Sequence, residues 1–100
     1  MIEVTTLKQL KDETKEGTVL LYFSASWCGH CVGLKQTLNR TIPSYGNKVK
    51  LIKVDVDNDE EIAPNYGIMS IPTLFLFENG TLTKQHVGGL SESDLKVFIG

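Results

Sequence analysis

The sequence predicts an α/β protein with a central mixed β-sheet and helices on both of its faces. The first observation is the almost continuous apolar run over residues 18–23, which is typical of a strand buried on both faces. The second is the alternation of strand-like and helix-like segments, in the order β-α-β-α-β-α-β-β-α. The third is the length: 100 residues, 41% of them hydrophobic, suit one compact domain over residues 1–100.

A capping pattern predicts the first helix. Thr6 and Gln9 have the spacing at which a hydroxyl and an amide side chain each bind a free backbone N–H at a helix start. This helix is expected to run to about residue 16. After the strand at 18–23 and a short loop, residues 28–41 form the second predicted helix. Its expected apolar face consists of Val32, Leu34, Leu38 and Ile42.

Three further segments follow in the middle of the chain. Residues 49–56 alternate and are rich in β-branched side chains, so they predict a second strong strand. Residues 59–66 predict a short helix that Pro64 interrupts or ends. Residues 73–77 are apolar and aromatic, and they predict a third central strand.

The last part of the chain is predicted as a hairpin and a helix. Asn79-Gly80 is a tight-turn signal, so residues 81–87 are expected to return antiparallel to the strand before it. Ser91 and Asp94 mark the start of a closing helix. The residues expected to face the sheet are Leu95, Phe98 and Ile99.

Charge and apolar runs argue against several classes of protein. The net charge is −2, and lysines and acids are mixed along the chain without a basic patch, so we expect no binding to nucleic acid or to anionic membranes. The N-terminal residues lack a signal-peptide pattern, and no run approaches the ~18 apolar residues of a membrane span. We therefore expect a cytoplasmic protein and, since no surface-facing apolar stripe is visible, a monomer.

The most informative motif is Trp27-Cys28-Gly29-His30-Cys31, which holds the only two cysteines of the chain. It follows a predicted strand, and the carboxyl ends of parallel strands are where open α/β sheets place their sites. Cys28 begins a helix, where free N–H groups stabilise a thiolate, and a protonated His30 adds positive charge. Cys28 is therefore the candidate nucleophile. Cys31 lies one turn deeper and is expected to attack second, which closes a disulfide.

Other interpretations of these residues are weaker. A four-coordinate zinc site needs two more ligands, and His30 and His86 are the only imidazoles. A purely structural disulfide across so short a loop removes little entropy from the unfolded chain. The acidic segment at residues 55–59 resembles the start of a calcium loop, but Glu60 and Tyr66 stand where glycine and glutamate are required. We favour a redox pair with no metal and no organic cofactor.

A second constellation is Ser70-Ile71-Pro72-Thr73, directly before the third central strand. Proline is tolerated at the first residue of a strand. From the spacing alone, a cis Ile71–Pro72 bond that turns the backbone of Ile71 sideways and a trans bond that merely starts the strand are equally acceptable.

Four segments, in this order, make the chain resemble the thioredoxin family: 27–31, 63–73, 75–80 and 87–90. The resemblance covers nearly the whole chain and implies the thioredoxin fold, a three-layer α/β/α arrangement around a mixed sheet. It also implies that Pro72 is a cis-proline beside the cysteines and that the backbone of Ile71 binds an extended peptide. The residues that it assigns to substrate binding are Trp27, Gly29, Ile71, Pro72 and Gly88.

Two of the chain's departures from the family concern residues of the predicted site. His30 stands where a typical thioredoxin has proline, and Cys-Gly-His-Cys resembles the motif of protein disulfide isomerase. Tyr22 stands where the family has a buried acid that serves the resolving cysteine, while Lys53 matches the lysine that partners this acid. A phenol is a poor base at neutral pH, so we expect mixed disulfides to persist longer than in a typical thioredoxin.

The resemblance implies a thiol–disulfide oxidoreductase that reduces disulfide-containing proteins and is recharged by a reductase similar to thioredoxin reductase. His30 favours an alternative, an oxidase or isomerase of an oxidising compartment. A domain that only docks a partner protein through its thioredoxin-like surface is a further alternative.

Overall fold

The computed structural model describes residues 1–59 and 61–100. Its elements follow the predicted alternation, with one additional 3-10 helix. They are β1 (Ile2–Glu3), α1 (Leu7–Thr14), β2 (Thr18–Ser24), α2 (Gly29–Thr41), η1 (Ile42–Tyr45), β3 (Val49–Asp55), α3 (Ile62–Asn65), β4 (Thr73–Glu78), β5 (Thr81–Val87) and α4 (Glu92–Ile99). None of the helices in these described residues has the length and apolar character of a membrane crossing.

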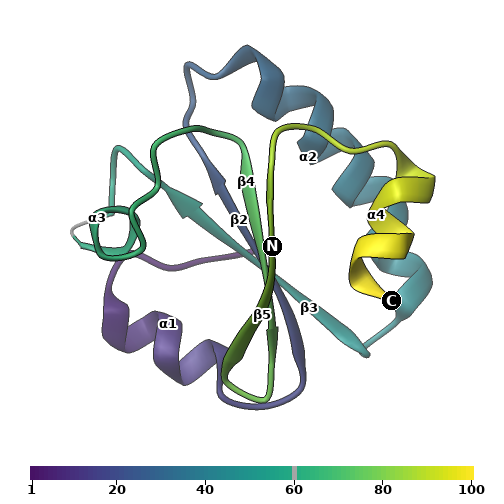
Figure 1. Ribbon diagram of the computed structural model, residues 1–100, viewed down its shortest axis with the longest axis horizontal. Helices are drawn as coiled ribbons and strands as arrows, with labels where there is room; N and C mark the ends of the chain where they lie inside the picture. Colours follow the sequence, from purple (N-terminus) through teal and green to yellow (C-terminus); the bar gives the residue numbers. More distant parts are fainter. Residues whose placement is uncertain (60) are drawn as a thin grey trace.

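The sheet is mixed, as predicted. Its five strands lie in the order β1-β3-β2-β4-β5, with β2 at the centre. β2 pairs parallel with β3 and antiparallel with β4, and β5 pairs antiparallel with β4. The start of β4 therefore lies at the same edge of the sheet as the ends of β2 and β3, which brings residues near 25, 56 and 72 together (Figure 1).

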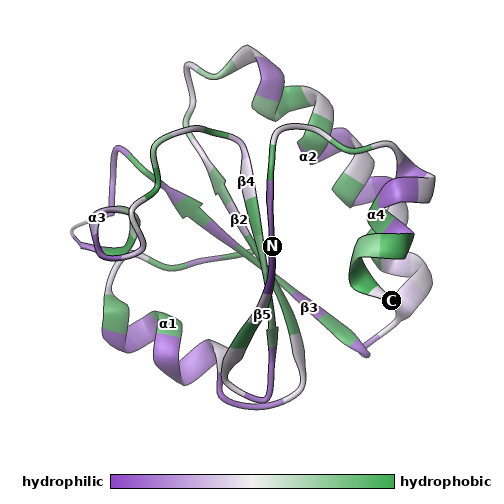
Figure 2. Ribbon diagram, viewed as in Figure 1, coloured by the Kyte–Doolittle hydropathy of each residue, from purple (hydrophilic) through white to green (hydrophobic). Residues whose placement is uncertain are grey.

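Helices cover both faces of this sheet, so the molecule has three layers. α1 and α3 lie on one face, and α2 and α4 lie on the other (Figure 1). Alternate residues of β2 pack against opposite helix layers. Leu20 and Tyr22 pack with α2 and α4, whereas Leu21 and Phe23 pack with α1 and α3. Figure 2 shows the hydrophobic colour gathered on the strands and on the sides of the helices that face them.

The N-terminal caps form as the sequence predicts. The Gln9 backbone N–H donates to Thr6 Oγ1 at 3.1 Å, and the Thr6 N–H donates to Gln9 Oε1 at 3.3 Å, which completes the capping box of α1. Ser91 caps α4 by accepting from the Asp94 N–H at 3.1 Å. α1 ends at Thr14, two residues before the predicted end.

The predicted apolar face of α2 is wrong at one residue. Val32 is 55% exposed, whereas Leu34, Leu38 and Ile42 are buried. The buried face instead includes Cys31, which lies three and seven residues before Leu34 and Leu38. Because consecutive helix residues are rotated by about 100°, Val32 is turned away from this face.

α3 is shorter than the predicted helix at 59–66. The Asp59 carboxylate accepts from the backbone N–H groups of Ile62 at 2.6 Å and Ala63 at 3.2 Å, so the helix begins only at Ile62. Pro64 is the third residue of α3, where a missing N–H costs no helical bond. Glu60, within the predicted range, lies outside the described residues.

The hairpin between β4 and β5 has the predicted turn. Asn79 and Gly80 both have positive φ, 52° and 88°, as a two-residue type I′ turn requires. The turn is tied to the loop between α1 and β2, since the Gly17 N–H donates to Asn79 Oδ1 and the Asn79 N–H donates to Gly17 O, both at 2.9 Å. Thr83 is an extra residue in the β5 register, and its hydroxyl donates to Leu76 O.

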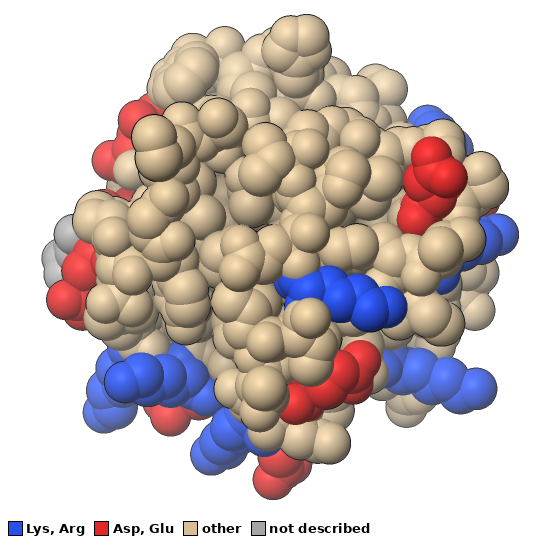
Figure 3. All heavy atoms as spheres, viewed as in Figure 1, with Lys and Arg blue, Asp and Glu red and all other residues tan. Residues whose placement is uncertain are grey.

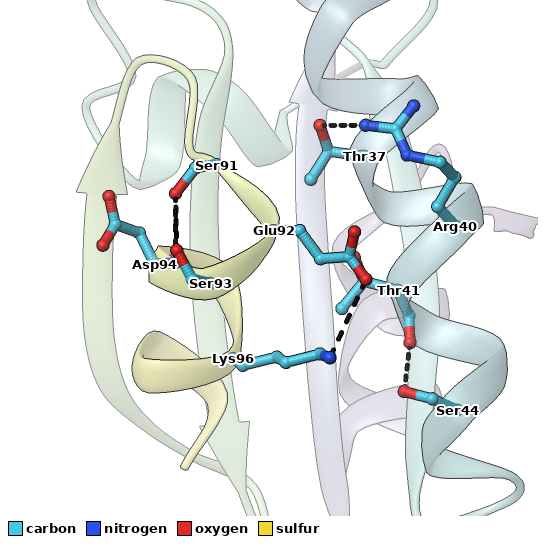
Figure 4. A network of polar contacts seen from close by, with 9 residues as sticks. All are labelled: Thr37, Arg40, Thr41, Ser44, Ser91, Glu92, Ser93, Asp94 and Lys96. Atoms are coloured by element: carbon cyan, nitrogen blue, oxygen red, sulfur yellow. Dashed lines mark hydrogen bonds and ion pairs between the residues drawn. The ribbon is translucent and has the colours of Figure 1, made fainter.

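α2 and α4 lie side by side and meet through apolar residues. Leu34 and Leu38 of α2 belong to one buried cluster with Leu95 and Ile99 of α4. Figure 4 shows polar side chains around this seam, and each contact drawn stays within α2–η1 or within α4 and its N-cap residue. The position of α4 against α2 is therefore set by apolar packing rather than by the polar contacts of that network.

Candidate active site

Cys28 and Cys31 form a disulfide at the junction of β2 and α2, with their Cα atoms 5.3 Å apart. Both side chains are buried; Cys28 is 6% exposed and Cys31 is 3% exposed. Cys28 is thus the more accessible of the two sulfur-bearing residues, by a small margin.

Cys28 is the N-cap residue of α2. Its Sγ accepts a hydrogen bond from the Cys31 backbone N–H at 3.1 Å. After reduction, the same N–H and the positive end of the helix would stabilise a negative charge on this sulfur. Gly29 and His30 follow in the first helical turn and are exposed, so the imidazole lies at the solvent side of the motif.

The segment before β4 lies next to the cysteines. The Ile71–Pro72 peptide bond is cis, the conformation that the family resemblance implies. Ile71 packs against the buried cluster that contains both cysteines. The Gly88 N–H donates to Pro72 O at 2.8 Å, and Gly88 has a φ of 99° that a side chain would strain. The residues predicted from three distant parts of the sequence thus meet at one edge of the sheet.

An apolar hollow of about 210 Å³ lies between Trp27 and Ile71. Trp27 is 68% exposed, and Met69 on the rim of the hollow is 95% exposed. In Figure 3 the upper part of the surface, where the β2–α2 junction lies in Figure 1, shows few charged residues. Exposed apolar side chains beside the disulfide are suited to docking an extended peptide.

Asp57 and Met69 are site residues that the sequence analysis missed. The Trp27 Nε1–H donates to Asp57 Oδ2 at 2.7 Å, which holds the indole beside Cys28. In the sequence pattern, Asp57 stands out only as part of the segment that resembles a calcium loop. Its position two residues after β3, at the edge where β2 ends, is the signal that would have placed it near Trp27.

Tyr22 contacts the helix of the motif directly. Its hydroxyl donates to the Cys31 backbone oxygen at 2.7 Å. Burial raises the pKa of the Tyr22 phenol above its ordinary value of 10.0, and a hydrogen bond with Ser24 offsets part of this rise. Lys53 is the cross-strand neighbour of Tyr22 on β3, so the two predicted supporting residues lie side by side.

No group of three or more histidine, cysteine, aspartate or glutamate side chains gathers as a metal site in the described residues. The acidic segment that resembles a calcium loop is used differently. Asp55 Oδ1 accepts from the Asp57 N–H at 2.9 Å, Asp57 binds Trp27, and Asp59 caps α3.

Comparison with known proteins agrees with this geometry. Residues 2–100 match the family model of thioredoxin. A thioredoxin of Bacillus subtilis (strain 168) is 43% identical over 76 residues, which are 76% of this chain and 73% of that protein. A thioredoxin of Pseudomonas aeruginosa is 35% identical over 99% of this chain and 93% of that protein. The crystal structure of oxidized mitochondrial thioredoxin 3 from Saccharomyces cerevisiae matches with a TM-score of 0.88 at 26% identity, over 98% of this chain and 92% of that one.

Proposed function

This chain belongs to the thioredoxin family, and we propose that it reduces disulfide bonds in protein substrates, with Cys28 as the attacking sulfur and Cys31 as the resolving one. Thioredoxins are thiol–disulfide oxidoreductases, and the chain carries the disulfide-capable pair that this activity uses, so it is an enzyme of this class. The family implies disulfide-containing proteins as substrates and a reductase as electron donor.

The observation that carries the proposal is the closed Cys28–Cys31 disulfide at the N-terminus of α2, beside exposed apolar side chains. The Cys28 sulfur is the one that caps the helix, so its thiolate is the better stabilised of the two. Trp27, Gly29, Ile71, Pro72 and Gly88 are proposed to bind the substrate peptide around it.

In the proposed reaction, the Cys28 thiolate attacks one sulfur of a substrate disulfide, and the other substrate sulfur leaves with the electron pair. A bond between Cys28 Sγ and the substrate results. Cys31 then loses its proton and attacks Cys28 Sγ, which releases the second substrate sulfur. The substrate gains two electrons, the cysteine pair is oxidised, and a separate reductase restores the dithiol.

The two single variants test these roles. We expect Cys28→Ser to abolish reduction of a disulfide-containing protein, because the attacking sulfur is lost and the remaining thiol, Cys31, is buried. We expect Cys31→Ser to stop turnover but to accumulate a mixed disulfide that mass spectrometry detects as a substrate adduct. Val97→Ser, which changes an exposed side chain of α4, is the control and should keep full activity. Turnover by Cys28→Ser at the rate of the control would contradict the proposal.

A reducing, cytoplasmic setting and a monomeric state are part of the proposal; no metal or organic cofactor enters it. His30 favours the second candidate, an oxidase or isomerase, because a cation near Cys28 stabilises the reduced form and makes the disulfide more oxidising. The further alternative is a domain that only docks a partner protein. In that case the Cys28→Ser, Cys31→Ser double variant would keep its biological activity, whereas a redox enzyme would lose it.

A further inference from the structure

A second cavity, of about 240 Å³, lies beside the disulfide on the face of the sheet covered by α2 and α4. Its lining includes Cys28, Cys31, Tyr22, Lys35 and Lys53. Lys35 is exposed and Lys53 is half-buried, so the cavity runs from solvent to the buried Cys31. It is separate from the apolar hollow beside Trp27.

The charge in this cavity is positive. Its lining residues include two lysines and no aspartate, glutamate or histidine. The ion pairs formed within the described residues use other lysines, Lys50 with Glu13 and Lys96 with Glu92. Neither Lys35 nor Lys53 forms an ion pair with a described carboxylate, although Glu3 on β1 is the cross-strand neighbour of Lys53. The two lysine side chains in the lining make the cavity attractive to a small anion.

No side chain in the lining of this cavity is suited to accept the Cys31 proton near neutral pH, and the hydroxyls of Ser24 and Ser26 are not bases there. Its lysines carry ammonium groups, which only donate hydrogen bonds. The Tyr22 hydroxyl already donates its hydrogen to Cys31 O at 2.7 Å, and burial raises the pKa of this phenol, so it stays neutral at pH 7. A neutral phenol does not take up a proton from a thiol near neutral pH.

We propose that the cavity beside Cys31 binds a small oxyanion between Lys35 and Lys53, and that this anion accepts the proton that Cys31 loses during resolution. The inference rests on the proposed function and assigns it an external base. The Cys31 S–H bond breaks and its proton passes to an anion oxygen. The bond between Cys31 Sγ and Cys28 Sγ forms as the bond from Cys28 Sγ to the substrate sulfur breaks, and the electron pair leaves with that sulfur.

The reaction of the reduced protein with a neutral dipyridyl disulfide tests this proposal. Attack by Cys28 and resolution by Cys31 each release one chromogenic thiopyridone, so the two steps appear as two phases. With excess dipyridyl disulfide, the first phase reports attack by Cys28 and the slower, concentration-independent phase reports resolution by Cys31. Inorganic phosphate is the probe, and sulfate is its matched control, because sulfate has a similar shape and charge but is a far weaker base. Both are varied at constant pH and at an ionic strength fixed with chloride.

We expect phosphate to accelerate the second phase several-fold, with a rate that saturates as the phosphate concentration rises. Sulfate alone should leave the rate of the second phase unchanged. When both anions are present, sulfate should reduce the acceleration by phosphate, because the two compete for the same cavity. Lys53→Gln and Lys35→Gln should each weaken the phosphate effect. Lys48→Gln, an exposed lysine before the opposite end of β3, should keep it.

Two variants at Tyr22 complete the test. Tyr22→Phe should keep the acceleration by phosphate, because the phenol is not the acceptor. Tyr22→Asp should resolve roughly tenfold faster or more without phosphate and lose the phosphate effect, since a positioned general base contributes about 10²–10⁴-fold.

Equal effects of phosphate and sulfate, or no effect of either, would overturn the proposal. Loss of the phosphate effect in Tyr22→Phe would overturn it as well, because the phenol would then relay the proton. Failure of the proposed function looks different: the first phase itself would be absent.

Discussion

At the scale of single residues, Tyr22 shows how one buried side chain shapes the surroundings of Cys31. The phenol occupies a buried strand position and donates to Cys31 O, so it fastens the first turn of α2 to β2. The sequence predicted that this position supplies only a poor base at neutral pH. It did not predict the hydrogen bond, because the bond depends on how β2 and α2 pack, which no local pattern encodes.

Tyr22 also predicts a dependence of stability on alkaline pH. The folded protein holds the phenol proton more tightly than the unfolded chain does, because the pKa is raised in the folded state. The stabilisation of the folded state that this raised pKa provides is fully present below about pH 10, and it is lost as the pH rises through the pKa of the folded state. We expect the free energy of unfolding of the oxidised protein to fall more steeply above pH ~10 in the wild type than in Tyr22→Phe.

Urea unfolding at neutral and alkaline pH measures this difference. Tyr45→Phe, at a half-buried tyrosine outside the site, is the matched control and should keep the alkaline slope of the wild type. At neutral pH, Tyr22→Phe should cost about 1 kcal/mol for the lost hydrogen bond. Equal alkaline slopes in the wild type and Tyr22→Phe would refute the assignment.

At the scale of elements, the sequence predicted the bounds of a helix or strand well where a clear apolar or β-branched pattern marks it. The bounds of β2 and β3 differ from their predictions by one residue, because β-branched and apolar runs mark buried strands. α3 was predicted too long, because Asp59 acts as a cap rather than as a helical residue. η1 was not predicted; its four residues after α2 carry no periodicity.

The capping box of α1 predicts the effect of a single substitution. Thr6→Ala removes the hydroxyl that accepts from the Gln9 N–H, so we expect a loss of about 1 kcal/mol in the free energy of unfolding. Lys8→Ala changes an exposed residue of the same helix and should shift stability by no more than about 0.5 kcal/mol. Denaturant unfolding of both variants is the measurement, and equal losses would show that the cap is not stabilising.

At the scale of the whole molecule, topology assembles the site. β4 runs antiparallel to β2, so its first residue lies at the edge where β2 and β3 end. Trp27, Asp57 and Ile71 meet there although long stretches of chain separate them. The sequence predicted this edge as the site and named Trp27 and Ile71. It could not predict the cavity with Lys35 and Lys53, because a cavity is a property of side-chain packing.

The edges of the sheet predict a monomer. β1 is two residues long, and β5 carries Lys84, Gln85 and a register shift, all features that disfavour pairing with another chain. We expect sedimentation equilibrium to give the mass of one 11.1 kDa chain across a wide concentration range. A mass that rises toward two chains with concentration would contradict this expectation.

The central claim is that Cys28 and Cys31 work as a redox pair, and their reduction potential tests it most directly. Equilibration in graded thiol–disulfide buffers, with Trp27 fluorescence as the reporter, gives this value. We predict one two-electron transition between about −270 mV, the value for thioredoxin, and about −180 mV, the value for protein disulfide isomerase. A value near the first would favour the proposed reductase, and one near the second would favour the oxidase or isomerase. The absence of any two-electron transition would contradict the account.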